Sequence, residues 1–243
     1  MATLYIVATP IGNLEDITLR AIRTLKEVDL ILCEDTRQTR KLLDHYEIQT
    51  KTMSYHQHSG VGKVNLIMQK LRDGANLALV TDAGTPAIND PGVALVHELV
   101  LMLGDDLTVS PIPGPSAVTA ILSASGLPSH DFRFLGFLPH KKGRETMFEL
   151  IRDSDSTTVC YESTHRISKT LKRLTEVLDP MRQLVVGREL TKKFETIYRG
   201  TPQEVMRQID ESSSRGEFVI VIGPRQKSSG DYEYDDSDKT FLD

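Results

Sequence analysis

Residues 79–92 read LVTDAGTPAINDPG. The stretch starts in the apolar end of a predicted buried strand and passes into a loop that is rich in Gly, Pro, Asp and Asn. An apolar segment with helical spacing follows at residues 93–103. A strand that leads through a short loop into a helix is the first half of a βαβ unit. The stretch therefore predicts a parallel sheet with a stiff, polar loop at the carboxyl end of one strand.

The same alternation of short apolar runs and amphipathic segments continues through the first half of the chain. It predicts an N-terminal α/β domain over residues 1–112, with a mostly parallel sheet that helices cover on both faces. The predicted strands are 4–8, 30–34, 51–56, 77–82 and 107–112, and the predicted helices are 17–27, 37–46, 62–72 and 93–103.

The second half begins after the stiff segment PIPGPSA at 111–117 and follows another pattern. Two of its apolar runs, at 183–190 and 194–200, are neighbours with no helix between them, which requires an antiparallel pair. Residues 113–225 are therefore predicted to form a C-terminal α/β domain with a mixed sheet. One further helix is predicted to start at TPQE, residues 201–204, with Thr as N-cap, Pro at the first helical position and Glu three residues after the cap. The other predicted elements of this domain are helices at 116–125, 143–152 and 165–178 and strands at 132–138, 157–162 and 217–224.

The charge of the chain is unevenly distributed. The 243 residues carry a formal net charge of −5, and 39% of them are hydrophobic, which is ample for packed cores. Residues 230–243 hold six acidic side chains against Lys239 alone, and without this segment acidic and basic residues are equal in number. A nucleic-acid partner is therefore compatible with the body of the chain. The tail, 226–243, is predicted to be acidic and disordered.

Cys33 and Cys160 each follow an apolar run and are far apart in the sequence. Neither has metal-ligand spacing, so both are predicted to be buried, reduced thiols, and no metal site is expected. No run of 18 apolar residues occurs, and no charged region precedes the apolar N-terminal stretch. Neither a membrane span nor a signal peptide is indicated, and the predicted location is the cytoplasm.

Loops at the carboxyl ends of the predicted strands are the candidate ligand site, because ligands of open α/β sheets gather at that edge. The Gly and Pro residues offer rigid backbone groups to a flat ligand with polar edges, although they can also simply form tight turns. No dinucleotide or Walker-type phosphate motif is present. We expect a cleft between the two domains, lined by the loops 8–16, 33–40, 81–92, 111–117 and 161–166.

Eight motifs carry a resemblance to a known family. LYIVATPIGNLEDITLRA, CEDTRQTRKLL, LVTDAGTPAINDPG and PIPGPSAVTAILSASGLP follow one another, and FLGFLPHKKGR, YESTHR, GRELTKKFE and GEFVIVI come after them. In order and spacing they resemble the ribosomal RNA branch of the tetrapyrrole-methylase-like superfamily, whose members are S-adenosylmethionine-dependent methyltransferases. The resemblance covers about residues 4–222.

The resemblance implies two α/β domains with S-adenosylmethionine in the cleft between them, and a homodimer. It also implies methyl transfer to the 2′-hydroxyl of a cytidine in the decoding region of small-subunit (16S) ribosomal RNA. The chain departs from the family pattern at Thr81, Asn89 and Thr164, and it ends in an acidic tail where many relatives carry a further segment. The matching cofactor positions are Pro10, Asp82, Gly84, Thr85, Ala87, Ile88, Ser116, Ala117 and Tyr161.

A ribose hydroxyl is weakly acidic, so a base nearby would help the transfer, in which donor and acceptor atoms must be held about 3–3.5 Å apart. The sequence does not rank the candidates for this base. They are Glu34, Asp35, Glu162 and Glu189, with His56 as a further possibility.

Each of these candidates also has a structural interpretation. Glu34 and Asp35, in the loop 33–40, can neutralise Arg37 or cap the helix that follows. Ser163 can cap the helix that follows Glu162, which would then have a structural role. Glu189 can pair with Lys192 across a turn.

Basic residues near the predicted loops are candidates for phosphate contacts with RNA. The alternative for each of them is an ordinary solvated helix face. The candidates are Arg37, Arg40, Lys141, Lys142 and Arg144.

Three other functions are compatible with parts of the pattern. One is methylation of a small molecule such as a porphyrinoid by the same fold, against which the EDTR, ATPIGN and YEST segments speak. Another is a non-catalytic nucleotide-binding module. The third is a metal-dependent phosphohydrolase that uses Asp35, Asp82 and Asp90.

Overall fold

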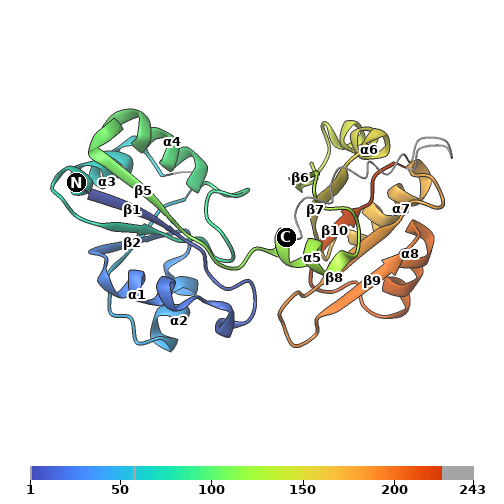
Figure 1. The fold of residues 1–243 in the computed structure, drawn as a ribbon, viewed down its shortest axis with the longest axis horizontal. Coiled ribbons are helices and arrows are strands. Elements are labelled where there is room, and N and C mark those ends of the chain that lie inside the picture. Colours follow the sequence, from blue (N-terminus) through green and yellow to red (C-terminus); the bar gives the residue numbers. More distant parts are fainter. Residues whose placement is uncertain (1, 57–58, 226–243) are drawn as a thin grey trace, which may run out of the picture. The chain divides into compact units, whose positions relative to one another are not determined.

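The computed structural model of the protein describes residues 2–56 and 59–225, which form two compact units (Figure 1). The tail that was predicted to be disordered, 226–243, lies outside the described residues. Of the described residues, unit 1 consists of 2–124, 187–196 and 216–219, and unit 2 consists of 125–186, 197–215 and 220–225.

The first sheet has five strands in the order β3-β2-β4-β1-β5. Every pairing in it is parallel, with Leu4 opposite Leu77 in the pair β1 and β4. This confirms the predicted parallel sheet, and it places the loops that follow β1, β4 and β5 side by side at one edge. The strands are β1 Ala2–Val7, β2 Leu30–Cys33, β3 Thr52–Ser54, β4 Leu77–Leu79 and β5 Leu107–Ile112.

Helices cover both faces of the first sheet, as predicted (Figure 1). One cluster of buried side chains joins the sheet to α3 and α4, and a second cluster joins it to α1 and α2. In α3 the buried residues are Val64, Ile67, Met68 and Leu71, which is the spacing of an amphipathic helix. The helices up to residue 125 are α1 Leu19–Glu27, α2 Thr36–His45, α3 Val61–Arg72, α4 Gly92–Leu103 and α5 Ala117–Ser125, with short 3₁₀ helices at Leu14–Asp16 and Gly104–Asp106.

Polar side chains fix where several helices begin. The Thr18 hydroxyl accepts a hydrogen bond from the Ala21 N–H at the start of α1. The Asp35 carboxylate accepts one from the Arg37 N–H at the start of α2. At the start of α8, Thr201 forms a capping box with Glu204, which confirms the signal in the sequence.

The second sheet also has five strands, in the order β6-β7-β10-β8-β9. It is mixed, as the two neighbouring strands without an intervening helix predicted. Its strands are β6 Phe132–Phe137, β7 Thr157–Ser163, β8 Leu184–Arg188, β9 Thr196–Gly200 and β10 Glu217–Ile222, and the helices are α6 Arg144–Asp153, α7 Ile167–Val177 and α8 Pro202–Glu211.

Both cysteines are buried and unbridged, which confirms the prediction. The Cys33 thiol donates to the Met53 carbonyl at 3.8 Å. Burial raises the pKa of the Cys160 thiol to about 12, so this group is neutral at physiological pH. Among the described helices, none has both the length and the apolar character that crossing a bilayer requires.

Candidate active site

Two loops at the carboxyl edge of the first sheet are joined by backbone hydrogen bonds. The Thr9 N–H donates to the Gly84 carbonyl at 2.9 Å, and the Gly84 N–H donates to the Thr9 carbonyl at 3.0 Å. The Thr9 hydroxyl also donates to the Thr81 carbonyl at 3.1 Å. Because Thr9 is buried, these bonds are protected from water and hold the loop after β1 against the loop after β4.

The loop after β5 packs against the same pair. The Thr85 hydroxyl donates to the Pro115 carbonyl at 3.2 Å. At Gly114, an added Cβ would lie only 3.0 Å from the Ala8 Cβ, so glycine permits a close approach there. The loops 8–16, 81–92 and 111–117 therefore form one rigid assembly, as their Gly and Pro content suggested.

Within this assembly, loop 81–92 has an unusual backbone. Gly84, Ala87 and Asn89 have φ angles of +85°, +64° and +65°. The Asp90 carboxylate stabilises this path by accepting from the Ala87 N–H at 3.0 Å and from the Gly92 N–H at 2.7 Å. The loop exposes the Ile88 side chain, 50% of which is accessible, and the Asp82 carboxylate. Thr85, also predicted to bind the cofactor, is half-buried.

Glu34 lies in the loop 33–40, which follows β2, and is hydrogen-bonded to this assembly. Its Oε1 accepts from the Thr81 hydroxyl at 2.8 Å. Burial raises the pKa of the Glu34 carboxyl above its ordinary value of 4.5; the Thr81 hydrogen bond opposes that shift, and the charges of Asp90 and Asp82 add to it. A half-buried carboxylate with a raised pKa is the typical environment of a general base.

Asp35, the next residue, has a different environment. It caps α2 and forms an ion pair with Arg37 at 2.8 Å, which confirms the structural interpretation of this residue. The hydrogen bonds from the Arg37 side chain and backbone lower the pKa of the Asp35 carboxyl to about 2. A carboxylate with so low a pKa is a weak base. The Asp35 N–H donates to the Asp82 Oδ1 at 3.3 Å, so loop 33–40 is tied to loop 81–92.

Glu162 is buried in unit 2, and the partners of its carboxylate are side-chain and backbone groups of the same unit. Its Oε1 lies 2.7 Å from the Arg166 Nε and accepts from the Ser163 N–H at 2.8 Å. Its Oε2 accepts from the Thr170 hydroxyl at 2.6 Å and lies 3.7 Å from the Arg144 Nη2. The side chain has no accessible surface, so these contacts favour the structural interpretation. The predicted cap was wrong: Ser163 ends β7, and α7 starts at Ile167 with Arg166 at the N-cap and no side-chain cap.

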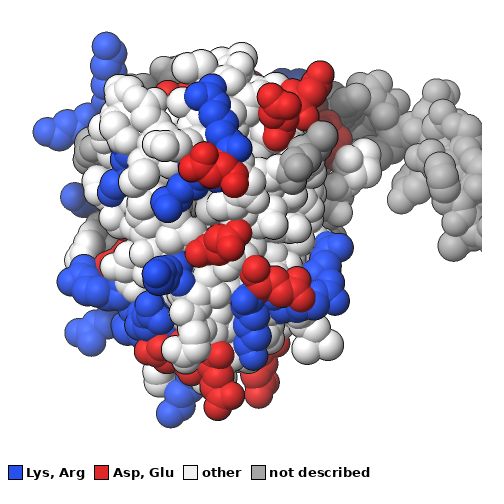
Figure 2. Space-filling view, turned by 90° about the vertical axis from the view of Figure 1, so that its left-hand side faces the viewer, with Lys and Arg blue, Asp and Glu red and all other residues white. Residues whose placement is uncertain are grey.

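The basic candidates differ in exposure. The Arg37 side chain is 87% exposed, and the Arg40 side chain lies 3.9 Å from the Asp44 carboxylate. Lys141 and Lys142 are exposed in the turn between β6 and α6. Arg144 is only 17% exposed, since its guanidinium donates to the Pro139 carbonyl and the Thr170 hydroxyl. The face seen in Figure 2 carries Lys and Arg mainly toward its left edge, with Asp and Glu side chains through its centre and at its bottom.

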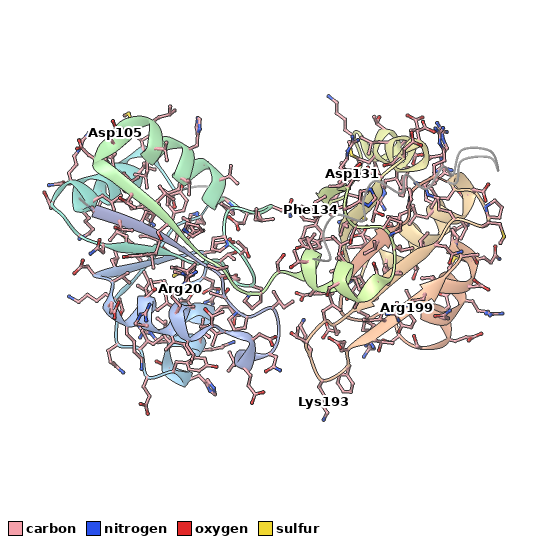
Figure 3. All side chains as sticks on the ribbon, in the orientation of Figure 1. Arg20, Asp105, Asp131, Phe134, Lys193 and Arg199 are labelled. Atoms are coloured by element: carbon pink, nitrogen blue, oxygen red, sulfur yellow. The ribbon has the colours of Figure 1, made fainter. Side chains whose placement is uncertain are left out.

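Glu189 follows β8 and is held by two partners. Its Oε1 lies 3.0 Å from the Lys192 Nζ and accepts from the Glu217 N–H at 2.9 Å. Burial alone would raise the pKa of the Glu189 carboxyl, but these two donors lower it below 4.5. The predicted pairing with Lys192 is confirmed. Lys193, the residue after Lys192, lies at the tip of the loop between β8 and β9 (Figure 3).

The remaining predicted cofactor residues are dispersed. Tyr161, on β7, is half-buried and makes edge contacts with Phe134 and Phe137, with ring centroids 4.9 and 5.4 Å apart (Figure 3 labels Phe134). Ser116 and Ala117 begin α5, where the Ser116 carbonyl accepts from the Ala120 N–H.

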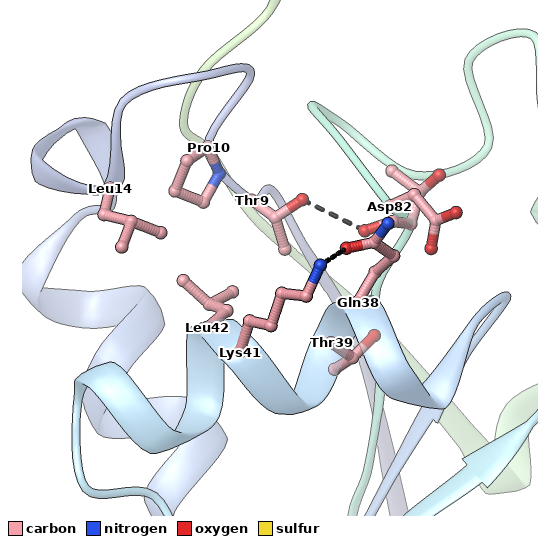
Figure 4. Close-up of a pocket in the computed structure, with 9 residues that line it drawn as sticks. Thr9, Pro10, Leu14, Gln38, Thr39, Lys41, Leu42 and Asp82 are labelled. Atoms are coloured by element: carbon pink, nitrogen blue, oxygen red, sulfur yellow. Dashed lines mark hydrogen bonds between the residues drawn. The ribbon is translucent and has the colours of Figure 1, made fainter.

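Pro10 lines a pocket of about 180 Å³ between α2 and the loop after β1 (Figure 4). Gln38, Lys41 and Leu42 of α2 also line it and were not among the predicted site residues. Their i, i+3, i+4 spacing is the signal that could have placed them on one side of the helix. The full lining is Thr9, Pro10, Leu14, Gln38, Thr39, Lys41, Leu42, Thr81 and Asp82.

The described residues contain no group of three His, Cys, Asp or Glu side chains that could hold a metal ion. Asp35, Asp82 and Asp90 therefore do not form the cluster that a metal-dependent phosphohydrolase would use. Their contacts explain them instead as a helix cap, an exposed loop carboxylate and a support of the loop backbone.

Comparisons with known proteins agree with this arrangement. Residues 3–206 match the family model described as tetrapyrrole (corrin/porphyrin) methylases. A ribosomal RNA small subunit methyltransferase I from Halalkalibacterium halodurans is 47% identical over 221 residues, which is 90% of this chain and 75% of that protein. The protein of the same name from Bacillus subtilis is 45% identical over 223 residues, or 91% of this chain and 75% of that protein.

Solved structures share the fold at lower identity. One is a uroporphyrin-III C-methyl transferase from Thermus thermophilus, complexed with S-adenosyl homocysteine, with a TM-score of 0.62 at 20% identity over 91% of this chain and 97% of that chain. Another is a cobalt precorrin-4 methyltransferase, with a TM-score of 0.66 at 19% identity over 91% of this chain and 94% of that chain. The chain therefore belongs to the tetrapyrrole methylase family and, within it, to the family of ribosomal RNA small subunit methyltransferase I.

Proposed function

We propose that this protein transfers the methyl group of S-adenosylmethionine to the 2′-hydroxyl of a cytidine in the decoding region of small-subunit ribosomal RNA. The observation that carries the proposal is the rigid loop assembly at the carboxyl edge of the first sheet. It occurs in a chain that is 47% identical to a relative named ribosomal RNA small subunit methyltransferase I. Methyl transfer depends above all on holding donor and acceptor in line, which a rigid loop assembly can do.

Loop 81–92 fits the proposed cofactor. S-adenosylmethionine supplies an electrophilic methyl group on a cationic sulfonium, and it also carries an amino-acid portion. The exposed Asp82 carboxylate can offset positive charge, and the exposed Ile88 of the same loop offers an apolar contact. Asp82, Gly84, Thr85, Ala87 and Ile88 would hold the cofactor, together with Pro10, Ser116, Ala117 and Tyr161.

Glu34 is the residue that we propose as general base among the carboxylates. Its raised pKa and its hydrogen bond to Thr81, a residue of the pocket lining, support this assignment. The contacts of Glu162 and the lowered pKa values of Asp35 and Glu189 favour structural roles for those three residues. Glu34 would accept the proton of the ribose hydroxyl as the new C–O bond forms.

Exposed basic side chains would hold the ribosomal substrate by its phosphates. Arg37, Arg40, Lys141 and Lys142 remain candidates for such contacts because their side chains are accessible. Arg144 would contribute only through the small accessible part of its side chain. The proposed substrate also places the protein in the cytoplasm, with the ribosomal subunits.

A homodimer belongs to the same proposal. Helix α4 exposes several large apolar side chains, which would favour association with a second copy of the chain. These are Val93, Val100, Leu101 and Met102, with 53%, 47%, 69% and 57% of their surface accessible. Sedimentation of the full chain tests this point, because Leu101→Glu should shift a dimer toward the monomer and leave a true monomer unchanged.

The decisive assay offers labelled S-adenosylmethionine with isolated small ribosomal subunits that lack this modification. Label should enter the ribosomal RNA, and digestion with mass spectrometry should locate it on one cytidine ribose. Label in added uroporphyrinogen III instead would favour the porphyrinoid alternative. Binding of S-adenosylhomocysteine without transfer to either substrate would favour a non-catalytic module.

A further inference from the structure

The pocket between α2 and the loop after β1 has been given no ligand of its own so far. Its volume of about 180 Å³ is below the range of roughly 300–1,000 Å³ that complete small-molecule sites occupy. It is therefore suited to one fragment of a larger ligand, such as one nucleotide of an RNA strand.

The pocket shares a wall with the loops that are expected to hold the cofactor. Pro10 and Asp82 are matching cofactor positions, and Thr81 hydrogen-bonds to Glu34. A group bound in the pocket would thus lie next to both the donor site and the proposed base. An acceptor for in-line transfer must lie in such a place, because the reacting atoms have to approach to about 3–3.5 Å.

The chemistry of the lining matches a nucleotide. Pro10, Leu14 and Leu42 supply apolar surface for the faces of a base. Lys41 supplies a cation, and its Nζ donates to the Gln38 Oε1 at 2.8 Å (Figure 4). Both residues are exposed on α2, so a strand of RNA at the surface can reach them. Sequence-specific recognition of RNA uses unstacked bases that enter such pockets.

Thr39 adds a buried polar group to the lining. Thr39 is only 5% exposed, and its hydroxyl interacts with the Cys33 thiol, but no group of the described residues forms a well-aligned hydrogen bond with it. A buried hydroxyl without such a bond is costly unless a ligand or water completes it.

We propose that this pocket receives the cytidine that is methylated, with the base between Pro10, Leu14 and Leu42 and the Lys41 ammonium on an adjacent phosphate. When Lys41 moves to the phosphate, the Gln38 Oε1 loses its donor and accepts from the cytosine N4 amine instead. This assignment rests on the proposed function, and it adds Lys41 and Gln38 as residues that select the substrate.

Lys41→Met tests the assignment, with Lys26→Met as the matched control. Lys26 is an exposed lysine of α1 outside the lining, so both variants lose one surface charge of the same unit. We expect Lys41→Met to raise the KM for small subunits about tenfold, the effect of roughly one charge-assisted contact. The affinity for S-adenosylhomocysteine should not change, and Lys26→Met should change neither quantity.

Leu14→Trp provides a second variant, since the larger ring would fill the pocket from a side chain that is already 38% exposed. It should retain S-adenosylhomocysteine binding and lose most transfer. Cytidine 3′-monophosphate, added with S-adenosylhomocysteine, should shift the NMR signals of Leu14 and Leu42 in the wild type, and it should leave the Leu42 signals of Leu14→Trp unchanged.

The outcomes separate the two proposals. If the wild type methylates subunits while Lys41→Met and Leu14→Trp behave like it, the pocket assignment is rejected and the proposed function stands. If the nucleotide shifts signals elsewhere in the chain, the assignment is also rejected. If the wild type binds S-adenosylhomocysteine but methylates no subunits, the proposed function fails and the assignment fails with it.

Discussion

Thr9 and Gly84 exchange two backbone hydrogen bonds of 2.9 and 3.0 Å, although 75 residues separate them in the sequence. They form an antiparallel bridge between loops that leave parallel strands. Pro10 and Thr85, the residues that follow Thr9 and Gly84, are both expected cofactor positions, so this backbone bridge fixes the chain next to each of them.

Replacing Gly84 by Ala should weaken cofactor binding. An L residue at φ +85° is strained by about 1–2 kcal/mol, and the new Cβ would lie 3.4 Å from the Ile11 Cγ2. The loop should relieve this strain by shifting away from its native path. We expect the Kd for S-adenosylhomocysteine to rise about tenfold, measured by calorimetry, because a small shift costs on the order of 1.4 kcal/mol of binding.

Gly74→Ala is the matched control for this variant. Gly74 has φ +89°, but nothing lies within 4 Å of an added Cβ, and the residue is remote from the loop assembly. Both variants should lower Tm by a similar amount, and Gly74→Ala should bind S-adenosylhomocysteine as the wild type does. Equal affinity in the two variants would show that the loop is not the cofactor site.

Glu34→Gln should lower kcat for methyl transfer by about 100-fold or more, the usual contribution of a general base. Since burial raises the pKa of this carboxyl, kcat of the wild type should rise with pH through a value above 4.5, and the variant should lose that dependence. Asp35→Asn is the control, because Asn also caps helices well and Asp35, with a pKa of about 2, stays ionised over the pH range of the assay. A wild-type pH profile in Glu34→Gln would contradict the assignment.

The same substitution should also change stability in a pH-dependent way. A carboxyl whose pKa is raised in the folded state stabilises the protein fully below its unfolded pKa, and this stability is lost as the pH rises through the folded pKa. Glu34→Gln cannot ionise, so its Tm should exceed that of the wild type at pH 7 and approach it at pH 4. An equal difference at both pH values would mean that the charge of Glu34 is not the cause.

Arg182→Met should destabilise unit 2 strongly. Arg182 is 1% exposed and donates four hydrogen bonds to the carbonyls of Gly223, Arg152, Ile151 and Ser154, at 2.7 to 3.1 Å. The substitution removes a buried guanidinium and its four hydrogen bonds at once, which should cost about 3 kcal/mol or more. Thermal unfolding measures the loss, and Arg173→Met, on an exposed helix surface, should leave Tm unchanged. Similar Tm values would show that water replaces the guanidinium.

The order of helices and strands was predictable because the spacing of apolar residues distinguishes helices from strands, and some helices, such as α8, also carry a start signal. The buried positions of α3 and the TPQE signal are examples that needed no distant partner. The bridge between Thr9 and Gly84, the four acceptors around Arg182 and the pocket of α2 were not predictable in this way. Each arises from groups that only the folded sheet brings together, and no local pattern encodes their pairing.

The candidate bases illustrate the same limit. In the sequence, Glu34 and Glu162 both stand at the end of an apolar run, and residue type alone does not separate a catalytic from a structural carboxylate. Their difference lies in their partners: Arg166 and Arg144 approach the Glu162 carboxylate at 2.7 and 3.7 Å, whereas Glu34 accepts from the Thr81 hydroxyl. The number of cations and hydrogen-bond donors around a carboxylate, rather than its residue type, decides whether it can still accept a proton.

The last prediction concerns the turn between β6 and α6. Reversing Lys141 and Lys142 to Glu should weaken binding to small ribosomal subunits and reduce the salt dependence of that binding by about one unit of slope per lost phosphate contact, with no effect on S-adenosylhomocysteine binding. The control reverses Lys169 and Lys172, two exposed lysines of α7 in the same unit, and changes the net charge equally. Filter binding at several salt concentrations measures both slopes. If the two double variants lose affinity equally, overall charge accounts for the effect and the turn makes no specific contact with RNA.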